Sequence, residues 1–379
     1  MPVRALARVN LAAIERNCVR LRRELDDRAQ LAAVVKADGY GHGAVPVARA
    51  ALAGGAGWLA VAAAAEAAQL REGGIEAPVL VMGALSPEEL PVALEAGADV
   101  VAWHGPFVAR VAELAAQRGA RPVGVHVKLD TGMGRLGTRD PEEARRVADV
   151  VAQAPDLRLA GVMTHFATAD QPGTDDGFFE AQLERFASFV ERVRAEHPDV
   201  LAHAANSAAT LRDPGSHFDL VRCGIAVYGL DPFHQDPAPR ELDPALELRS
   251  YVADLKPREP GESAGYGRRF VAQTPTVLGV LPIGYGDGWR RGLSNNADVL
   301  VGGRRVPLVG TISMDNVTVD LGPELAAAVG DPAILIGADG AERITAEEVA
   351  RRLDTINYEV TCGLTARVPR AYHRDGEPA

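Results

Sequence analysis

Short apolar runs alternate with helix-like stretches from Leu31 to Cys223, and no other pattern in the chain limits its fold as strongly. The runs are Leu31–Val35, Trp58–Ala62, Pro78–Met82, Asp99–Trp103, Val123–Lys128, Leu159–Phe166, Leu201–Ala205 and Phe218–Cys223. The stretches between them are rich in alanine, glutamate and arginine and include Ala44–Ala53, Ala63–Glu72, Pro141–Gln153 and Asp176–Glu196. Eight buried strands joined by helices predict an α/β fold, a (β/α)8 barrel of the TIM type.

A doubly wound open sheet is the alternative for the same pattern. Its first strand-to-helix turn is expected to carry a G-x-G-x-x-G motif and an acidic partner for a ribose. The glycines of Gly39–Gly43 follow a lysine and lack that partner, which favours the barrel. A helix over Leu11–Arg28, with Asn10 as its N-cap, is predicted to lead into the first strand.

The alternation of apolar runs and helix-like stretches ends near Glu241. The segment Asp231–Pro244 contains four prolines and is the expected linker. Beyond it lie strand-like runs with Gly/Pro turns and one helix-like piece, namely Leu248–Leu255, Thr276–Pro282, Val299–Val301, Val317–Leu321, Ala333–Ile336 and the helical Thr345–Leu353. We therefore expect a barrel domain over residues 1–240 and a mostly β C-terminal domain over residues 241–379.

Charge and composition narrow the partners. The chain of 379 residues has 40 basic and 51 acidic side chains, a net charge of -11, and no basic block, which argues against nucleic acid as a partner. It shows no apolar segment of membrane-spanning length and no secretory signal. The three cysteines are far apart and lack the spacing of a zinc site, so we expect no metal, free thiols and a cytoplasmic protein.

Lys36 directly follows the apolar run Leu31–Val35, at the expected mouth of the barrel. Partial burial lowers the pKa of an ammonium group and makes the amine a nucleophile or a base. The simpler alternative is a lysine that extends from a strand end into solvent.

Two later strands end in loops suited to an anion. Asn206 and Ser207 follow the seventh run, where Ser207 is expected to cap a short helix, and Gly224 and Ile225 follow the eighth. In such barrels the loops after strands 7 and 8 often hold phosphate. A strand-end lysine beside a phosphate site favours a phosphorylated aldehyde bound to an amine, and pyridoxal 5'-phosphate fits this description.

The fifth run places His126, Lys128 and Asp130 on one face, which we expect to point into the barrel mouth. The following glycine-rich loop is expected to be flexible enough to aim Arg135 at an anionic oxygen. His165 ends the sixth run and can stack on a ring, and Arg222 near the end of the eighth can reach a ring nitrogen.

Eight motifs in this order resemble those of alanine racemase, almost from end to end. They are AVVKADGYGHG at Ala33–Gly43, KLDTGMGRLG at Lys128–Gly137, MTHF at Met163–Phe166, ANSAA at Ala205–Ala209, RCGIAVYG at Arg222–Gly229, AGYGR at Ala264–Arg268, PIGYGDG at Pro282–Gly288 and GTISMD at Gly310–Asp315. The ordered set is specific to the family, although no single motif is.

The resemblance implies a pyridoxal-phosphate enzyme with two bases. Lys36 would bind the cofactor covalently and then act on one face of the α-carbon, and Tyr266 would act on the opposite face. In the family this tyrosine comes from the second subunit, which implies a homodimer with shared active sites. The product would be D-alanine for peptidoglycan.

The resemblance also implies roles for the other site residues. Tyr40, Asn206, Ser207, Gly224, Ile225 and Tyr358 would bind the cofactor at or near its phosphate, His165 would flank its ring, Arg222 would face its nitrogen, and Arg135 would bond its phenolic oxygen. Arg135, Met314 and Asp315 would contact the substrate. Lys128 is similar to a lysine that many family members carry as a carbamate.

Other functions remain open on the sequence alone. A racemase of serine or of several amino acids can use the same two bases, with Tyr285 and Tyr358 as candidates to restrict the pocket. A pyridoxal-phosphate amino-acid decarboxylase is less favoured because its expected motifs are absent here. A non-catalytic cofactor-binding protein with the same barrel would lack the C-terminal domain.

Overall fold

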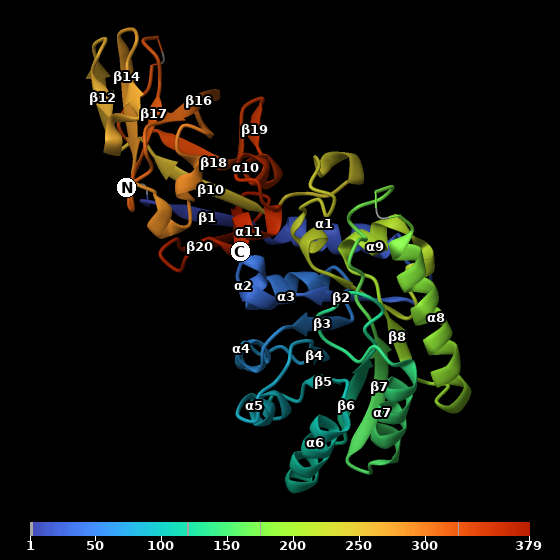
Figure 1. Ribbon diagram of the computed structural model, residues 1–379. Helices are drawn as coiled ribbons and strands as arrows, with labels where there is room; N and C mark the ends of the chain where they lie inside the picture. The colour runs from blue at the N-terminus through green and yellow to red at the C-terminus, as the bar shows by residue number, and fades with distance from the viewer. Residues whose placement is uncertain (1–2, 120, 175, 325) are drawn as a thin grey trace. The chain divides into compact units, whose positions relative to one another are not determined.

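The computed structural model describes residues 3–119, 121–174, 176–324 and 326–379 (Figure 1). The chain forms two compact units. The barrel unit contains Ile14–Tyr40 and Ala44–Val227. The β unit contains the chain up to Ala13, the short piece Gly41–Gly43, and Tyr228–Ala379.

The strands of the barrel unit form a parallel sheet that nearly closes on itself. Within the described residues, eight strands make this sheet: β2 (Gln30–Val34), β3 (Trp58–Val61), β4 (Val79–Val81), β5 (Asp99–Ala102), β6 (Val123–Lys128), β7 (Leu157–Met163), β8 (Leu201–His203) and β9 (Leu220–Cys223). From β2 to β8 each strand pairs with the next, and β9 pairs with β2, so β8 and β9 are the two ends of the sheet. Between β8 and β9, the amides of Asp219 and Arg222 donate to the carbonyls of Ala202 and Ala205 at 3.0 and 2.9 Å. The predicted barrel is confirmed.

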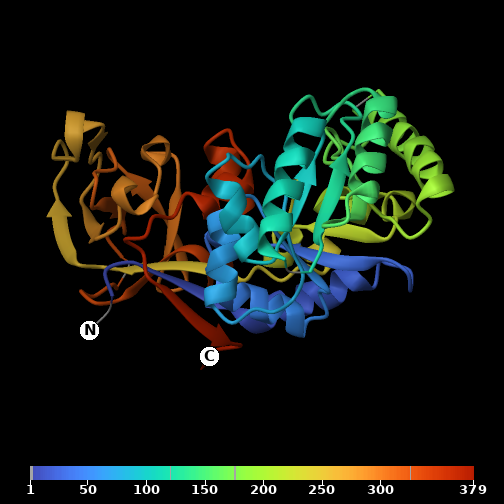
Figure 2. The ribbon, with the colours of Figure 1, turned by 90° about the horizontal axis from the view of Figure 1, so that it is seen from below.

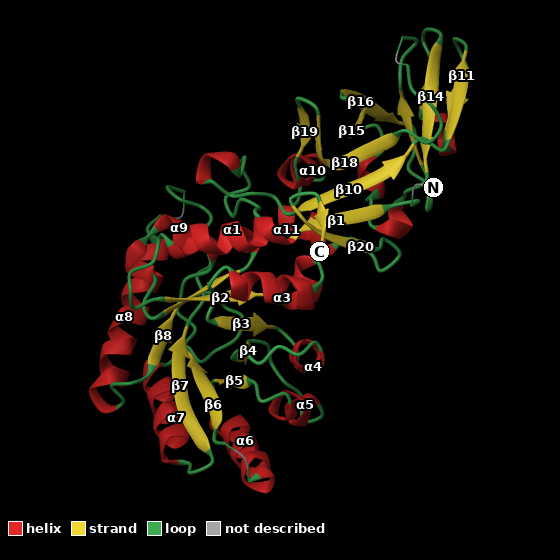
Figure 3. Ribbon diagram, turned by 180° about the vertical axis from the view of Figure 1, so that it is seen from behind, coloured by secondary structure: helices red, strands yellow, loops and turns green. Residues whose placement is uncertain are grey.

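Helices cover the outside of these strands, as Figure 3 shows in red around yellow. Their bounds are α1 (Leu11–Arg22), α2 (Lys36–Tyr40), α3 (Ala44–Ala53), α4 (Ala64–Glu72), α5 (Glu89–Glu95), α6 (Gly105–Arg118), α7 (Pro141–Gln153), α8 (Phe178–Glu196) and α9 (Ser207–Arg212). In Figure 2 they run from blue through green. The strands are buried on both faces by these helices and by the barrel interior, which explains why they read as continuous apolar runs.

The first helix begins where predicted but ends early. The side-chain oxygen of Asn10 accepts a hydrogen bond from the amide of Ala12 at 3.1 Å, as expected of an N-cap. The predicted end at Arg28 is wrong, because α1 stops at Arg22. The carboxylate of Asp26 accepts from the amides of Arg28 and Ala29, each at 3.0 Å, and this local turn competes with helix.

The β unit is built mainly of antiparallel strands. They are β1 (Leu6–Asn10), β10 (Leu246–Tyr251), β11 (Asp254–Arg258), β12 (Ser263–Ala264), β13 (Phe270–Val271), β14 (Thr276–Leu281), β15 (Asp298–Val301), β16 (Arg304–Val309), β17 (Val317–Asp320), β18 (Pro332–Asp339), β19 (Glu342–Ile344), β20 (Arg370–Arg374) and β21 (Glu377–Pro378). Its helices are α10 (Ala346–Arg352) and α11 (Asn357–Cys362). The prediction of a mostly β second part is confirmed.

One predicted strand of this unit divides in two. Leu248–Leu255 was expected as a single run, but it splits into β10 and β11 around Val252 and Ala253. The reason is a change of partner: β10 pairs with β1 and β18, whereas β11 pairs with β14.

The N-terminal segment contributes a strand that sequence reasoning missed. Strand β1 lies between β10, to which it is antiparallel, and β20, to which it is parallel. Its side chains alternate between half-buried and buried, with Ala7 and Val9 inside. This period of two was a readable signal.

Short turns of 3-10 helix occur at η1 (Pro214–Ser216), η2 (Ile225–Tyr228), η3 (Ala238–Arg240), η4 (Tyr266–Arg268), η5 (Tyr285–Asp287) and η6 (Arg291–Leu293). Over the ranges that the structure describes, the helices are too short or too polar to cross a lipid bilayer.

Candidate active site

Lys36 is half-buried and begins a tight turn directly after the buried Val35. The next four residues, Ala37 to Tyr40, have φ between 51° and 60°, so α2 is a left-handed turn rather than an ordinary helix. This region costs an L-residue about 1–2 kcal/mol. The turn is held by Glu66, whose carboxylate accepts from the amide of Ala37 at 2.6 Å. The strand-end position predicted for Lys36 is confirmed.

The loops after β8 and β9 come together on the ring of Tyr40. The hydroxyl oxygen of Ser207 accepts from the amides of Gly224 and Ala226 at 3.0 and 3.3 Å. Gly224 is in close contact with the tyrosine, since a Cβ at this position would lie 2.3 Å from the Tyr40 hydroxyl oxygen. Ile225 lies between the two amides and is fully buried. Both loops predicted to bind an anion therefore form one cluster.

The N-cap of α9 is Asn206 and not Ser207, so the predicted cap is wrong by one residue. The Asn206 side-chain oxygen accepts from the amide of Ala209 at 2.9 Å. Ser207 is already inside the helix, where its hydroxyl faces Gly224 instead of its own backbone.

Arg222 is buried and held in a fixed orientation. Its Nη1 lies 3.0 Å from Nδ1 of His203, and its Nη2 donates to the carbonyls of Thr164 and Ala204 at 2.7 and 2.9 Å. The same Nη2 lies 3.3 Å from Nδ1 of His165. In the described part of the chain these acceptors all face the two Nη atoms, which leaves the Nε–H for a ligand. Burial lowers the pKa of Arg222 to about 10, so the guanidinium stays charged at neutral pH.

Positive charge is concentrated around these groups. Burial, and then the charges of Arg222 and Arg135, lower the pKa of Lys128 to about 8. Burial and the same two arginines hold the pKa of His165 well below its ordinary 6.5, and Lys36 adds to both effects. His165 is therefore neutral, and four cations lie within electrostatic reach of it. Such a site suits an anionic ligand.

His126 and Lys128 on β6, and Asp130 just after it, are all buried. The glycine-rich loop that follows is less free than expected. The Asp130 carboxylate accepts from the amides of Gly132 and Gly134 at 3.0 Å each and fixes the turn that leads to Arg135. Arg135 itself is exposed.

In the β unit, Tyr266 and Met314 lie on loops that hydrogen bonds tie into the sheet. The hydroxyl of Thr311 donates to the carbonyl of Tyr266 at 2.8 Å. The amide of Gly286 donates to the carbonyl of Met314 at 2.9 Å. Both side chains remain open, with 71% of Tyr266 and 50% of Met314 exposed. Asp315 next to them pairs with a guanidinium nitrogen of Arg367 at 2.7 Å.

Tyr358 is half-buried on α11, and its neighbour Asn357 anchors that helix. The Asn357 amide nitrogen donates to the carbonyl of Asp231 at 2.8 Å and to the carboxylate of Glu347 at 3.0 Å. The ring of His234 meets the Tyr358 ring edge-on, with 6.2 Å between centroids. Sequence reasoning missed these supports, which carry no local signal.

The predicted site residues divide between the two units. The barrel unit holds Lys36, Tyr40, Lys128, Arg135, His165, Asn206, Ser207, Arg222, Gly224 and Ile225, and the β unit holds Tyr266, Met314, Asp315 and Tyr358. Sequence reasoning did not single out His203 or Asp99 as members of the barrel interior, although each is a polar residue in an apolar strand.

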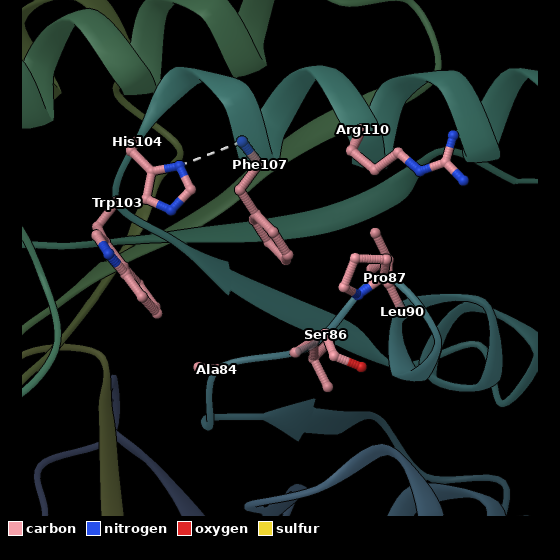
Figure 4. A pocket seen from close by; sticks show the side chains of 9 residues that line it. Ala84, Ser86, Pro87, Leu90, Trp103, His104, Phe107 and Arg110 are labelled. Carbon is pink, nitrogen blue, oxygen red and sulfur yellow. Dashed lines mark hydrogen bonds between the residues drawn. The ribbon is translucent and has the colours of Figure 1, made fainter.

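A separate cavity of about 300 Å³ lies in the barrel unit, along the loops after β4 and β5 (Figure 4). Trp103, Phe107 and Leu90 form its apolar wall. Nδ1 of His104 accepts a hydrogen bond from the amide of Phe107 at 3.2 Å, so His104 is the N-cap of α6. None of the predicted site residues lines this cavity.

The cluster around Ser207 has the chemistry of a phosphate cradle. It contains the hydroxyls of Ser207 and Tyr40, two amides that donate to the Ser207 hydroxyl oxygen, and a glycine where a Cβ would fill the space. These donors fit a phosphate monoester that also carries a carbonyl group.

Comparison with known proteins gives a consistent result. Residues 9–232 match the family model described as alanine racemase, N-terminal domain, and residues 245–372 match that of the C-terminal domain. A protein named alanine racemase from Geobacillus kaustophilus is 44% identical over 369 residues, which cover 97% of this chain and 94% of that protein.

Solved structures agree with these matches. The alanine racemase from D-cycloserine-producing Streptomyces lavendulae superposes with a TM-score of 0.92 at 38% identity and covers 98% of both chains. The alanine racemase from Bacillus anthracis with bound L-Ala-P has a TM-score of 0.89 at 37% identity, over 99% of this chain and 96% of that one.

Proposed function

The chain belongs to the alanine racemase family and is an isomerase of alanine, and from this premise we propose that it uses pyridoxal 5'-phosphate with Lys36 and Tyr266 as its two bases. The alternatives of serine racemase, decarboxylase and non-catalytic binding protein gain no support from the relatives.

One observation carries the cofactor proposal: the half-buried Lys36, the Ser207–Gly224 cluster and the buried Arg222 belong to one barrel end. Tyr40, Ser207 and the amides around Gly224 and Ile225 would hold the phosphate, with Asn206 fixing the loop and Tyr358 assisting. Lys36 would bind the aldehyde carbon, and Arg135 the phenolic oxygen.

When bound, the cofactor withdraws electrons from the amino acid and so makes its α-proton acidic. Arg222 would donate its Nε–H to the ring nitrogen. Because a guanidinium is a very weak acid, it would leave that nitrogen unprotonated and limit electron withdrawal. Neutral His165 would flank the ring without adding charge.

Inversion requires a group on each side of the α-carbon. The Lys36 amine would take or return the proton on one face, and the Tyr266 phenol would do so on the other. A single base tends to return the proton to the face it left, which restores the starting enantiomer. The Met314 amide and Arg135 would hold the carboxylate end of the substrate, with Asp315 close by.

We propose that Tyr266 serves the active site of a second copy of the chain. It is 71% exposed, and Met314 and Ile356 of the same unit are also exposed apolar side chains at 50% and 45%. A large aromatic and two apolar groups in solvent are typical of a surface that a partner covers. The assembly would be a head-to-tail homodimer with shared sites.

Lys128 is proposed to carry a carbamate. With its pKa near 8, part of the amine is neutral at neutral pH and can attack carbon dioxide, forming a C–N bond and releasing one proton. The anionic product would pair with Arg135, whereas an ammonium repels it. The test is intact mass: the carbamate adds one carbon dioxide, and a plain amine in bicarbonate buffer would contradict it.

The product, D-alanine, would supply peptidoglycan synthesis. Cys18, Cys223 and Cys362 form no disulfide, which supports a cytoplasmic location, where cysteines stay reduced.

The activity is tested with the holoenzyme in deuterated water. L-alanine is expected to lose its α-proton signal while D-alanine appears in chiral analysis. Retention of the α-proton would contradict the proposed function, and so would loss of the proton without formation of the D-enantiomer.

A further inference from the structure

A chain of hydrogen bonds leads away from Arg222 through the interior of the barrel. Nη1 of Arg222 lies 3.0 Å from Nδ1 of His203. Nε2 of His203 lies 2.8 Å from Nδ1 of His126, and Nε2 of His126 lies 3.3 Å from Oδ2 of Asp99. These residues come from strands β9, β8, β6 and β5, so the chain crosses the barrel from one strand to another.

The barrel is shaped around this chain. A Cβ on Gly161 would lie 2.4 Å from Nδ1 of His126, and a Cβ on Gly124 would lie 2.2 Å from Oδ2 of Asp99. Glycine weakens the interior of a strand unless another group approaches closely. Gly161 therefore makes room for the ring of His126, and Gly124 makes room for the carboxylate of Asp99.

The direction of every hydrogen bond follows from the two ends. A guanidinium can only donate, so Nδ1 of His203 must accept. A carboxylate can only accept, so Nε2 of His126 must donate. The one arrangement that satisfies all three contacts gives each imidazole a single proton, on Nε2.

Electrostatics supports this arrangement. Burial, then Arg222, holds the pKa of His203 well below its ordinary 6.5. For Asp99 burial acts to raise the pKa, but the hydrogen bond from His126 is the largest of the effects that lower it overall, which keeps the carboxylate ionised. Nη2 of Arg158 lies 3.2 Å from Oδ2 of Asp99.

We propose that Asp99 is a remote positioning residue, which acts through His126 and His203 to fix the orientation of Arg222 toward the cofactor. This rests on the proposed function only in its last step, the meeting of Arg222 with the cofactor. Asp99 sets the proton positions of both imidazoles, and these in turn present an acceptor to Arg222.

Replacement of Asp99 by asparagine keeps the shape but removes the constraint. An amide can donate as well as accept, so the chain can reverse. Reversal would place an N–H of His203 against an N–H of Arg222, and the guanidinium would lose a partner. Asp99 touches neither the substrate nor the cofactor in this account.

The first measurement uses the apoprotein labelled with 15N in histidine. Two-bond 1H–15N spectra report which ring nitrogen carries the proton. In the wild-type protein the rings of His126 and His203 are each expected to carry their proton on Nε2 at neutral pH, as the three hydrogen bonds require. Signals are assigned by their loss in H126N and H203N. A proton on Nδ1 of either ring in the wild-type protein overturns the proposal, even if no Asp99 variant folds.

The second measurement compares D99N with R158M. R158M removes the ion pair of Asp99 but leaves the carboxylate as acceptor, so it reports a merely structural role. D99N is expected to show Nδ1 protonation, a changed absorbance of the bound cofactor and about a tenfold lower kcat with KM little changed. R158M is expected to keep the wild-type ring protonation and kcat.

The two proposals fail in different ways. If the wild-type holoenzyme exchanges no α-proton, the proposed function is contradicted. The apoprotein spectra then still test the hydrogen-bonded chain from Asp99 to Arg222. A D99N variant with wild-type ring protonation, absorbance and kcat overturns the role of Asp99 but does not contradict the proposed racemase activity. Equal changes in R158M and D99N also overturn it, because the ion pair would then be the cause.

Discussion

The hydroxyl oxygen of Ser207 lies 3.0 Å from the amide nitrogen of Gly224, and this hydrogen bond joins the loops after β8 and β9. The two residues are 17 positions apart in the chain and both are buried. The contact holds the backbone around Ile225 against Ser207, so the barrel does not have to bring these two loops together when the cofactor arrives.

S207A is expected to weaken cofactor binding about tenfold and to lower stability by about 1–3 kcal/mol, because buried amides lose their acceptor. Titration of the apoprotein with pyridoxal 5'-phosphate, followed by absorbance, measures the first effect, and urea unfolding the second. S216A is the control. The Ser216 hydroxyl donates to the carbonyls of Ala209 and Asp213, so this variant should lose stability only. Equal cofactor affinity in both variants would contradict the prediction.

G224A tests the close packing of Tyr40. The added Cβ would lie 2.3 Å from the Tyr40 hydroxyl oxygen, so the ring has to move at a cost of about 1–3 kcal/mol. We expect strongly reduced cofactor affinity, read from the absorbance of the purified protein. G105A is the matched control, because a Cβ on Gly105 meets no atom within 4 Å. Wild-type affinity in G224A would show that the glycine is not needed.

The lowered pKa of Lys128 predicts that the stability of the apoprotein, measured without bicarbonate, depends on pH. Its pKa is about 8 in the folded chain, below the ordinary 10.5, so the unfolded chain binds more protons between these values. Stability should therefore rise from pH 8 to pH 10.5 by roughly 3 kcal/mol from this group, and should not change through it below pH 8.

The measurement is the difference between wild type and K128M in urea unfolding across that range. K256M serves as control, because Lys256 is an exposed partner of Asp254. A difference that stays flat from pH 8 to pH 10.5 would contradict the depressed pKa of Lys128.

Asp287 is expected to be a main support of the β unit. Its buried carboxylate accepts from both Nη atoms of Arg4, at 2.6 and 2.8 Å, and from the amide of Gly284 at 2.9 Å. Burial alone would raise the pKa of Asp287, but the hydrogen bond from Arg4 lowers it overall. The stabilisation is thus present above the ordinary carboxylate pKa and is lost as the pH falls through the lower, folded value.

D287N should lose about 3–5 kcal/mol at neutral pH, and its deficit should shrink below about pH 4. Denaturant unfolding at several pH values measures this. D254N removes a carboxylate from the exposed pair with Lys256 and should change stability by less than about 1 kcal/mol. If D287N loses no more stability than D254N, a structural role for the Asp287–Arg4 pair is excluded.

The sequence was sufficient for the barrel because its strands are local apolar runs, and each element could be recognised without its neighbours. Lys36, Ser207 and Gly224 could be found in the same way, since strand ends in a barrel share one edge. The cap of α9 was misassigned by one residue because asparagine and serine are both strong caps, and only the position of Gly224 decides which of the two side chains is engaged elsewhere.

Long-range relationships could not be read from the chain. Strand β1 pairs with β10 and β20, which lie more than 200 residues away in the sequence. Its short alternating pattern predicts a strand but not which strands it pairs with. Asp99 and His203 are single polar residues in apolar runs, which usually indicate a local hydrogen bond. Their connection through His126 depends on the closure of the barrel and on the space left by Gly124 and Gly161.

Mixing two inactive variants tests the shared two-base site most directly. K36A lacks one base and Y266F lacks the other, so each alone should fail to convert L-alanine to D-alanine. After the two are unfolded and refolded together, hybrid dimers should contain one intact site, and activity should return to about a quarter of the wild-type value under random pairing. Mixtures that stay as inactive as the separate variants would contradict the account, and so would full activity in either variant alone.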